Sequence, residues 1–337
     1  MLLLLAPFLL LADSVLAQSH PGRRGILQYE PSLPGNIIFG ILFAILGILF
    51  SYHIHKHSDR WALCLPIGAI ASALGYFLKL ALDPDNFALM LYVVQNALIV
   101  ISPSAFLAFN YMLYGRFITA IDPTFDINSP KQNSKMTKSR FSFIPPRIVG
   151  RTFVWSDIIT FLVQMAAGGM QAAGSKGGPS LSKLGYNLFL AGVTIQGISY
   201  CLFTALLTVA LKRLIEDRRT NPTLRGNTWK GLDRNTTLIV AGLYLSSLFI
   251  IIRSIYRIVE FAEGYDGYLI GQEIYLFILD AAPLVIAIGV FAFIWPPVLL
   301  DTIASQTRQA EQNHTMETGS ASIHTNNRNK SEWVPLV

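Results

Sequence analysis

Charged residues stand inside two stretches of this sequence that are otherwise apolar. Arg253, Arg257 and Glu260 follow one another at positions i, i+4 and i+7, so they share one face of a helix. Glu273 and Asp280 are seven residues apart and share a face in the next stretch. Opposite charges at such positions can bind the charged head group of a ligand, or they can neutralise one another as ion pairs.

A second set of polar residues lies in other apolar stretches. Asp157, Gln164 and Gln171 are also spaced by seven residues and therefore project from one helical face. Lys79 ends a further apolar stretch. Polar side chains are costly to expose to lipid, so we expect them to face the protein interior. Together with the charged residues they form the candidate ligand-binding set, for which no catalytic role is expected.

The elements that carry these residues are predicted to be membrane-spanning helices. Hydrophobic residues make up 52% of the chain and charged residues only 14%, and short polar connections separate the long apolar runs. A run of about 20 apolar residues is long enough to cross a bilayer. Such runs predict seven helices, over residues 36–52, 61–81, 88–114, 152–172, 186–211, 236–258 and 273–295. We therefore predict an all-α, polytopic membrane protein.

The first 17 residues are predicted to be a cleaved signal peptide. Their apolar core is too short to span a bilayer, and Val15 and Ala17 supply the small residues of a cleavage site. An uncleaved signal anchor is the alternative, because no Lys or Arg precedes the apolar core. The rest of the chain divides into an extracellular segment (18–35), a seven-helix membrane domain (36–300) and a flexible cytosolic tail (301–337).

Positive charges orient the predicted helices. The connections at 53–60, 115–151 and 212–235, together with the tail, hold 19 of the 26 Lys and Arg residues, whereas the opposite set of segments holds four. Because basic loops stay in the cytosol, the amino terminus is predicted outside and the carboxyl tail inside. Topology also accounts for the net charge of +6, so nucleic acid is not an expected partner. The longest loop, residues 116–150, lacks apolar periodicity and is expected to be flexible.

In this orientation the charged residues gather in the outer half of the membrane. With about 1.5 Å of rise per residue, Arg257 and Glu260 lie near the outer surface, and Arg253 lies one turn deeper. Asp280 lies roughly 10 Å further in than Glu273. These residues and Lys79 are expected to meet and neutralise one another. Two interpretations stay open: an ion-pair lock between the sixth and seventh helices, or a polar cavity for a ligand head group.

The sequence contains no motif for an enzyme or for a bound cofactor. GMQAAGSK, at 169–176, comes nearest to a phosphate-binding loop, but its Ser and Lys stand in the reverse of the required order. Serine, cysteine and zinc hydrolase motifs are absent. Cys64 and Cys201 fall in predicted helices without a partner cluster, so neither a disulfide nor a metal site is expected. The chain is therefore predicted to be neither an ATP-driven pump nor an enzyme.

Longer strings of residues resemble one known family. RSIYRIVEFAEGYDGY, followed by QEIYLFILDA, is similar to the signature of the fungal RTA-like lipid-translocating exporter family. The other matching segments are YEPSLPGNIIFGILF, GYFLK, YVVQNALIVISPSAFLAFNYMLYGR and DIITFLVQMAAGG. The resemblance covers roughly residues 29–300, in order. Ser72, Lys79, Gln272, Ile274 and Trp295 depart from the family pattern, which leaves the substrate open.

The resemblance implies a seven-helix fungal membrane protein, linked to resistance against toxic amphiphiles such as an aminosterol and to release of sphingoid long-chain bases. It implies a place in the plasma membrane or in an internal membrane, with the plasma membrane expected first. The family's charged and polar positions fall on Arg253, Arg257, Glu260, Glu273, Asp280, Asp157, Gln164 and Gln95. It implies no catalytic residue.

Two classes of function fit these features. A transporter would hold the ammonium of a cationic amphiphile, a lipid or a sterol-like ligand, against Glu273 or Asp280, while Arg253 and Arg257 pair with the acids of the empty site. A receptor, or a regulator of lipid asymmetry, would act through cytosolic signalling proteins or flippases without transport of its own. Seven helices with an outer amino terminus and basic inner loops suit either class.

Overall fold

The computed structural model describes residues 32–82, 89–122, 145–177, 179–220, 232–263, 268–269 and 272–309. The predicted signal peptide, most of the amino-terminal segment, the middle of the 116–150 loop and the tail beyond residue 309 lie outside the described residues. Signal-peptide cleavage and orientation in the membrane therefore stay predictions.

All regular structure in the described residues is helical. The first half of the bundle contains α2 (Leu33–His57), the 3₁₀ turn η1 (Arg60–Leu63), α3 (Cys64–Leu80) and α4 (Leu89–Ile121). The second half contains α5 (Pro146–Gly177), α6 (Pro179–Thr220), α7 (Arg234–Ala262), α8 (Glu273–Tyr275), the π-helical turn η5 (Leu276–Ala281) and α9 (Ala282–Phe293). Within the described chain, seven helices are long and apolar enough to cross a membrane, which confirms the predicted all-α polytopic fold.

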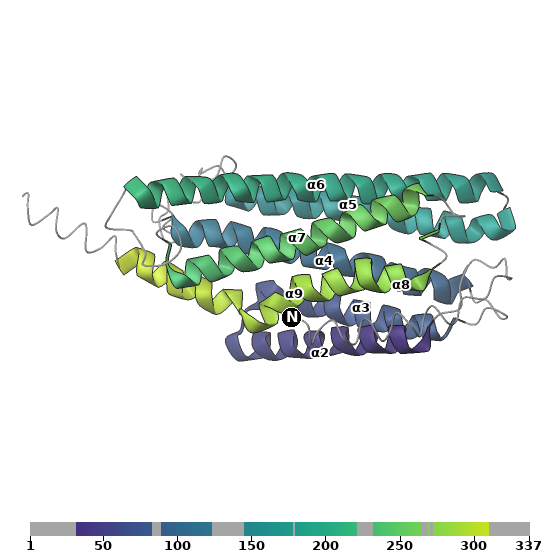
Figure 1. The fold of residues 1–337 in the computed structure, drawn as a ribbon, viewed down its shortest axis with the longest axis horizontal. Coiled ribbons are helices and arrows are strands. Elements are labelled where there is room, and N and C mark those ends of the chain that lie inside the picture. The colour runs from purple at the N-terminus through teal and green to yellow at the C-terminus, as the bar shows by residue number, and fades with distance from the viewer. Residues whose placement is uncertain are drawn as a thin grey trace, which may run out of the picture.

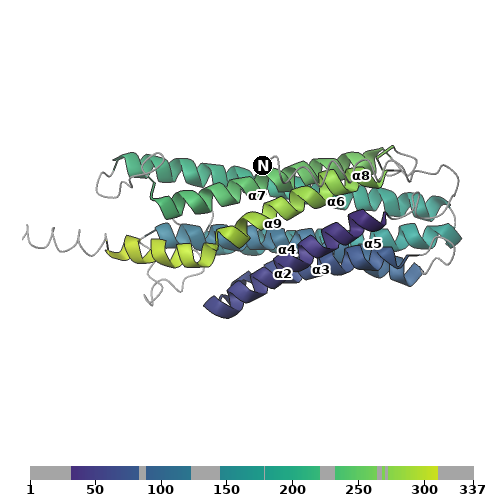
Figure 2. The same cartoon turned by 60° about the horizontal axis from the view of Figure 1, so that its bottom comes forward.

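The helices run roughly side by side along the long axis of the molecule (Figure 1). Neighbours in sequence pack on one another from α2 to α7, and α9 packs on both α7 and α2. The turned view shows α9 between these two helices (Figure 2). The last spanning helix therefore closes the bundle. Its π turn, η5, contacts both α7 and α2, so it can join polar side chains from distant parts of the sequence.

Two helices extend into the segment that the sequence predicted to be flexible. α4 continues to Ile121 and α5 begins at Pro146, so both ends of the 116–150 loop are helical. Phe117, Ile118 and Ile121 are buried, which explains the extension of α4: apolar residues on one face keep packing after the apolar run itself has ended.

A helix also occupies residues 296–309, part of which the sequence assigned to a flexible tail from residue 301. Leu300, Ile303 and Thr307 are buried at spacings of three and four residues, so one face of this helix packs against the bundle. The sequence did not predict this helix, because the segment is mostly polar and its apolar face is narrow. Helical structure thus continues beyond residue 300, where the flexible tail was predicted to begin.

The backbone of the last spanning helix widens at Asp280. η5 is a π-helical turn, and Pro283 follows it in the first turn of α9. Isolated π turns are rare in helices and are frequently found at functional sites. Pro283 has no N–H group, so a backbone hydrogen bond is lost just beyond the turn. The π turn was not predicted from the sequence.

Candidate functional site

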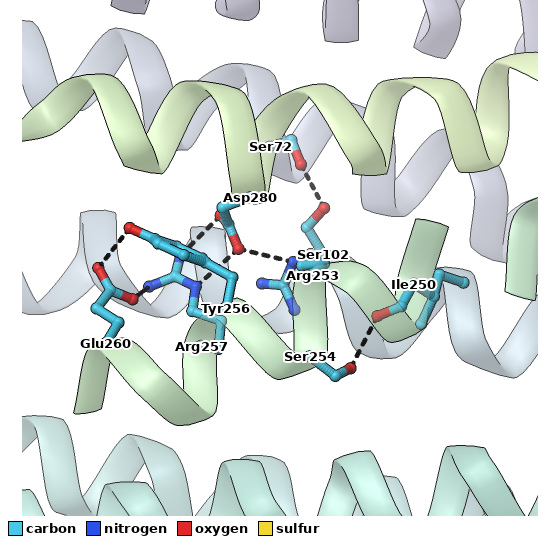
Figure 3. A network of polar contacts seen from close by, with 9 residues as sticks. All are labelled: Ser72, Ser102, Ile250, Arg253, Ser254, Tyr256, Arg257, Glu260 and Asp280. Carbon is cyan, nitrogen blue, oxygen red and sulfur yellow. Dashed lines mark hydrogen bonds and ion pairs between the residues drawn. The ribbon is translucent and has the colours of Figure 1, made fainter. Parts of the chain in front are cut away.

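Asp280 is the centre of a charged group between α7 and η5 (Figure 3). Arg257 donates hydrogen bonds from Nε to Oδ1 at 2.7 Å and from Nη2 to Oδ2 at 2.8 Å, so it binds both carboxylate oxygens. Arg253, one turn earlier on α7, brings its Nε within 2.8 Å of the same Oδ1, but its N–H does not point at that oxygen. One carboxylate that is 2% exposed thus lies against two cations.

Glu260 supplies the second negative charge of this group. Arg257 donates from Nη1 to Glu260 Oε2 at 3.1 Å, and the Tyr256 hydroxyl donates to Oε1 at 3.1 Å. The two arginines and Glu260 all point to one side of α7, as their spacing predicted (Figure 3). Together with Asp280 they sum to zero charge, which greatly lowers the cost of burying them in an apolar bundle.

Glu273 is the centre of a separate charged group. Its carboxylate lies 2.8 Å from Lys79 Nζ on α3. It also accepts hydrogen bonds from the Ser32 backbone N–H at 2.6 Å and from Asn36 Nδ2 at 2.9 Å. The same Asn36 nitrogen lies 2.9 Å from the Ser32 carbonyl oxygen. Glu273 therefore ties the start of α2 and the end of α3 to the start of the last spanning helix.

The predicted meeting of the six charges is thus realised as two neutral groups. Lys79 pairs with Glu273, and the two arginines pair with Glu260 and Asp280. Tyr76 on α3 is close enough to both groups to interact electrostatically with Lys79 and with Asp280. Asn36 and Ser32 were not predicted to take part. The signal available in the sequence was Asn36 itself, because it is the polar residue at the start of the first apolar run.

A cavity of ≈ 30 Å³ is lined in part by the two arginines. Its polar lining comes from Gln164 on α5, Gln196 on α6 and Arg253, Ser254 and Arg257 on α7. Water needs about 10–15 Å³ of such space, so the cavity has room for about two molecules. Figure 3 shows the two terminal nitrogens of Arg253 on the side of the guanidinium away from Asp280. Arg253 therefore joins the cavity to the charged group.

Gln164 takes part in a hydrogen-bonded chain that borders this cavity. Gln164 donates from Nε2 to Gln196 Oε1 at 3.1 Å, and Gln196 donates from Nε2 to Ser104 Oγ at 3.1 Å. Ser104 follows Pro103, a proline inside α4 that also lines the cavity. Proline removes a backbone hydrogen bond from a helix. Polar side chains of α4, α5 and α6 thus meet where the backbone of α4 is weakened.

The structure separates Asp157 and Gln171 from the charged groups. Asp157 is 2% exposed and faces the interior, as predicted, but within the described chain neither of its oxygens has a hydrogen bond. The Tyr111 hydroxyl on α4 is near enough to act on it, although the alignment is not that of a hydrogen bond. Gln171 lies beside Gly185 of α6, and its Nε2 has no hydrogen-bond partner among the described residues.

Other buried polar residues hold the helices together. Asn110 Nδ2 donates to Tyr200 Oη and to Ser246 Oγ, both at 2.9 Å, and Tyr200 Oη lies 3.1 Å from Ser247 Oγ. These bonds join α4, α6 and α7 near the middle of the bundle. Ser72 and Ser102 form a further hydrogen bond between α3 and α4 (Figure 3). Asn110 and Tyr200 therefore connect helices to one another.

A closed bundle of membrane-length helices with mutually neutralised charges inside it is a multi-pass integral membrane protein. The chain belongs to the RTA1-like protein family, because the family model described as RTA1 like protein matches residues 65–302. This match confirms the resemblance seen in the sequence. No solved structure is significantly similar to the chain.

Three fungal relatives illustrate the range of the family. Protein RTA1 of Saccharomyces cerevisiae is 26% identical over 312 residues, which cover 85% of this chain and 90% of that protein. Protoporphyrin uptake protein 1 of the same organism is 29% identical over 306 residues, covering 79% and 90%. Sphingoid long-chain base transporter RSB1 of Saccharomyces cerevisiae strain YJM789 is 29% identical over 178 residues, covering 44% and 45%.

Proposed function

We propose that this protein moves amphiphiles across or out of the bilayer, and that its ligands are cationic, such as sphingoid long-chain bases and aminosterol-like toxicants. The observation that carries the proposal is Asp280, a buried carboxylate held by two arginines within a membrane bundle. The names of two relatives, which refer to a sphingoid base transporter and to protoporphyrin uptake, support amphiphiles as the ligand class. We place the protein in the plasma membrane, with internal membranes as the alternative.

The ligand's ammonium group takes the place of Arg253 at Asp280. Arg253 is the weaker of the two partners, because its N–H is misaligned with the oxygen that it faces. Exchanging one cation for another keeps the carboxylate paired, whereas removing a partner from a buried ion pair costs about 3–5 kcal/mol. Glu273 is a less suitable acceptor because one cation and two further hydrogen bonds already occupy its oxygens.

Binding requires the bundle to open from the conformation seen here. A ligand pocket usually encloses about 300–1,000 Å³, ten times or more the volume beside Arg253. The helices best placed to separate are α7 and the last spanning helix, since the π turn of η5 and Pro283 leave that helix with fewer regular backbone hydrogen bonds. The acyl chain of the ligand would lie towards lipid between them.

A regulator or receptor without transport is the second candidate. It is favoured by the mutual neutralisation of Arg253, Arg257, Glu260 and Asp280, since an ion-pair lock between α7 and η5 needs no ligand. In that case ligand binding or lipid packing would move α7 relative to the last spanning helix. Cytosolic signalling proteins or flippases would respond to this conformational change.

Reconstitution separates the two candidates. The purified protein is placed in sealed vesicles, and a fluorescent sphingoid base is followed between leaflets for the wild type, Asp280→Asn and Arg253→Gln. Glu263→Gln is the matched control, because Glu263 is exposed just past α7 and outside the charged group. We expect movement by the wild type and the control and its loss in Asp280→Asn. Absence of movement by well-folded wild-type protein would reject transport and favour the regulator.

A further inference from the structure

Asp157 differs from the other carboxylates buried in the spanning helices. Glu260, Glu273 and Asp280 each have a cation within 3.1 Å. Asp157 is as buried as Asp280, yet in the described part of the chain neither of its oxygens has a hydrogen bond or an ion pair. It lies roughly 14 Å along α5 from Ile148, where the span begins, and so well inside the apolar layer.

Among the described residues, no positive charge lies against the Asp157 carboxyl. α5 packs against α4 and α6. The titratable groups that face Asp157 from these helices are the Tyr111 hydroxyl on α4 and the Tyr200 hydroxyl on α6. On the same helix, the Thr160 hydroxyl donates to the Asp157 backbone carbonyl at 3.0 Å and not to the Asp157 carboxyl. An ionised carboxylate in such a place would cost several kcal/mol, and a neutral carboxylic acid would cost less.

We propose that Asp157 binds a proton and that release of this proton is coupled to amphiphile movement, an inference that rests on the proposed transport function. In the closed bundle Asp157 is the neutral acid. When the bundle opens, the O–H bond of Asp157 breaks, the proton passes to water, and the carboxylate keeps the electron pair. Closure takes a proton back from water, so each cycle exchanges a proton for a ligand.

The geometry links Asp157 to the charged site. Asp157, Thr160 and Gln164 are all buried on one face of α5, and Gln164 is about 10 Å further along the helix. Gln164 lines the cavity that Arg253 and Arg257 also line, and it binds Gln196 of α6. Gly192 of α6 lies against Gln164, so α5 and α6 are in close contact at this point. A movement of α7 that separates Arg253 and Arg257 from Asp280 therefore also changes the cavity that Gln164 of α5 lines.

The test follows a permanently charged ligand under an imposed pH gradient. Purified full-length protein in sealed vesicles is given a fluorescent quaternary-ammonium amphiphile, whose charge does not titrate, and a potassium ionophore clamps the membrane potential. With one proton exchanged per ligand, a difference of about one pH unit sustains about a tenfold ligand gradient. We expect Asp157→Asn to abolish this accumulation while still equilibrating the ligand, and Asp157→Glu to retain it. Asp301→Asn, which changes an exposed carboxylate beyond the spans, is the control.

The outcomes separate the coupling from the transport on which it rests. The proposal is overturned if Asp157→Asn accumulates the ligand as much as the wild type does. It is also overturned if the wild type equilibrates the ligand but does not accumulate it in response to the pH gradient. A wild type that moves no ligand overturns the proposed function and the coupling with it. Infrared difference spectroscopy tests the proton directly: we expect a protonated-carboxyl band in the wild type at neutral pH that is missing in Asp157→Asn. A band that is unchanged in the variant overturns proton binding at Asp157.

Discussion

Arg257 binds both carboxylate oxygens of Asp280 and thereby joins α7 to the last spanning helix. Its remaining nitrogen binds Glu260 on its own helix, so the arginine is fixed to α7 at both ends. The hydrogen bonds and ion pairs of Asp280 among the described residues all come from α7. If the two helices separate first at Arg253, which is the weaker contact, Asp280 loses one of its two cations and keeps Arg257. Opening therefore exposes an acid that needs a new cation.

The first prediction concerns the coupling between these two residues. Arg257→Gln leaves Asp280 and Glu260 with a single cation, so we expect the free energy of unfolding to fall by about 3–5 kcal/mol. Arg253→Gln should reduce it less, because that ion pair is misaligned. The double variant Arg257→Gln/Asp280→Asn should be more stable than the sum of the single effects predicts, since it leaves neither residue unpaired. Denaturation of the purified variants in detergent micelles measures these differences.

Strictly additive effects of Arg257→Gln and Asp280→Asn would contradict direct pairing. Glu263→Gln serves again as the control, because its side chain is exposed, and we expect its free energy of unfolding to change by less than about 0.5 kcal/mol.

The second prediction concerns the contact between α2 and η5. A Cβ atom added at Gly35 would clash with the ring of Phe277 and would lie 2.8 Å from Ser32 Oγ. Phe277 stacks on Phe39 at 5.3 Å, so it has little freedom to move away. Gly35→Ala should therefore lower the free energy of unfolding by about 1–3 kcal/mol, as overpacking does.

A matched substitution in α9 should have the opposite sign. Apart from the chain neighbours of Gly289 and the backbone of its own helix, no atom of the described residues lies within 4 Å of a Cβ built at this position. Gly289→Ala gains helix propensity without a clash and should stabilise the protein by up to about 1 kcal/mol. Melting temperatures in the same detergent compare the two variants. Equal effects of the two substitutions would show that the close approach of α2 to η5 does not matter.

The sequence predicted the spanning helices and the residues of the charged site, because both depend on local periodicity. Arg253, Arg257 and Glu260 share a face in any α-helix, and apolar runs of sufficient length must span a bilayer. The division of the six charged residues into two neutral groups depends on which helices are neighbours, and this is not a local property of the sequence. The last spanning helix closes the bundle by packing beside α2, and this brings Asn36 to Glu273, 237 positions away in the sequence.

Two further features were beyond prediction for a related reason. The π turn at Asp280 depends on tertiary contacts of one helix, and the residues Leu276–Ala281 have no composition that distinguishes them from an α-helix. The predicted inward face of Asp157 is correct, but its separation from the cations that the structure describes depends on the side chains that α4 and α6 bring to it.

The third prediction uses the cavity beside the arginines. Val193 is buried and lines this space of ≈ 30 Å³. Val193→Ile adds one methylene, which the cavity has room to accept, so we expect the closed bundle to gain about 0.8 kcal/mol. Because the open state loses this contact, ligand movement in vesicles should slow by about fourfold. Faster movement with raised stability would show that the cavity takes no part in opening.

The last prediction assigns Glu273 a structural role that differs from that of Asp280. Glu273→Gln removes the charge that Lys79 pairs with and weakens the bonds from the Ser32 N–H and from Asn36. The first turn of α2 should then exchange its amide hydrogens faster, whereas the first turn of α7 should be unchanged. Asn36→Leu should have a similar but smaller effect, because it removes the hydrogen bonds to Glu273 and to the Ser32 carbonyl but no charge. Hydrogen exchange with mass spectrometry measures both. The contrary outcome is that Glu273→Gln abolishes ligand movement while hydrogen exchange at the start of α2 stays the same. That result would make Glu273 the acid that binds the ligand, and Asp280 would then serve in the ion-pair lock between α7 and η5.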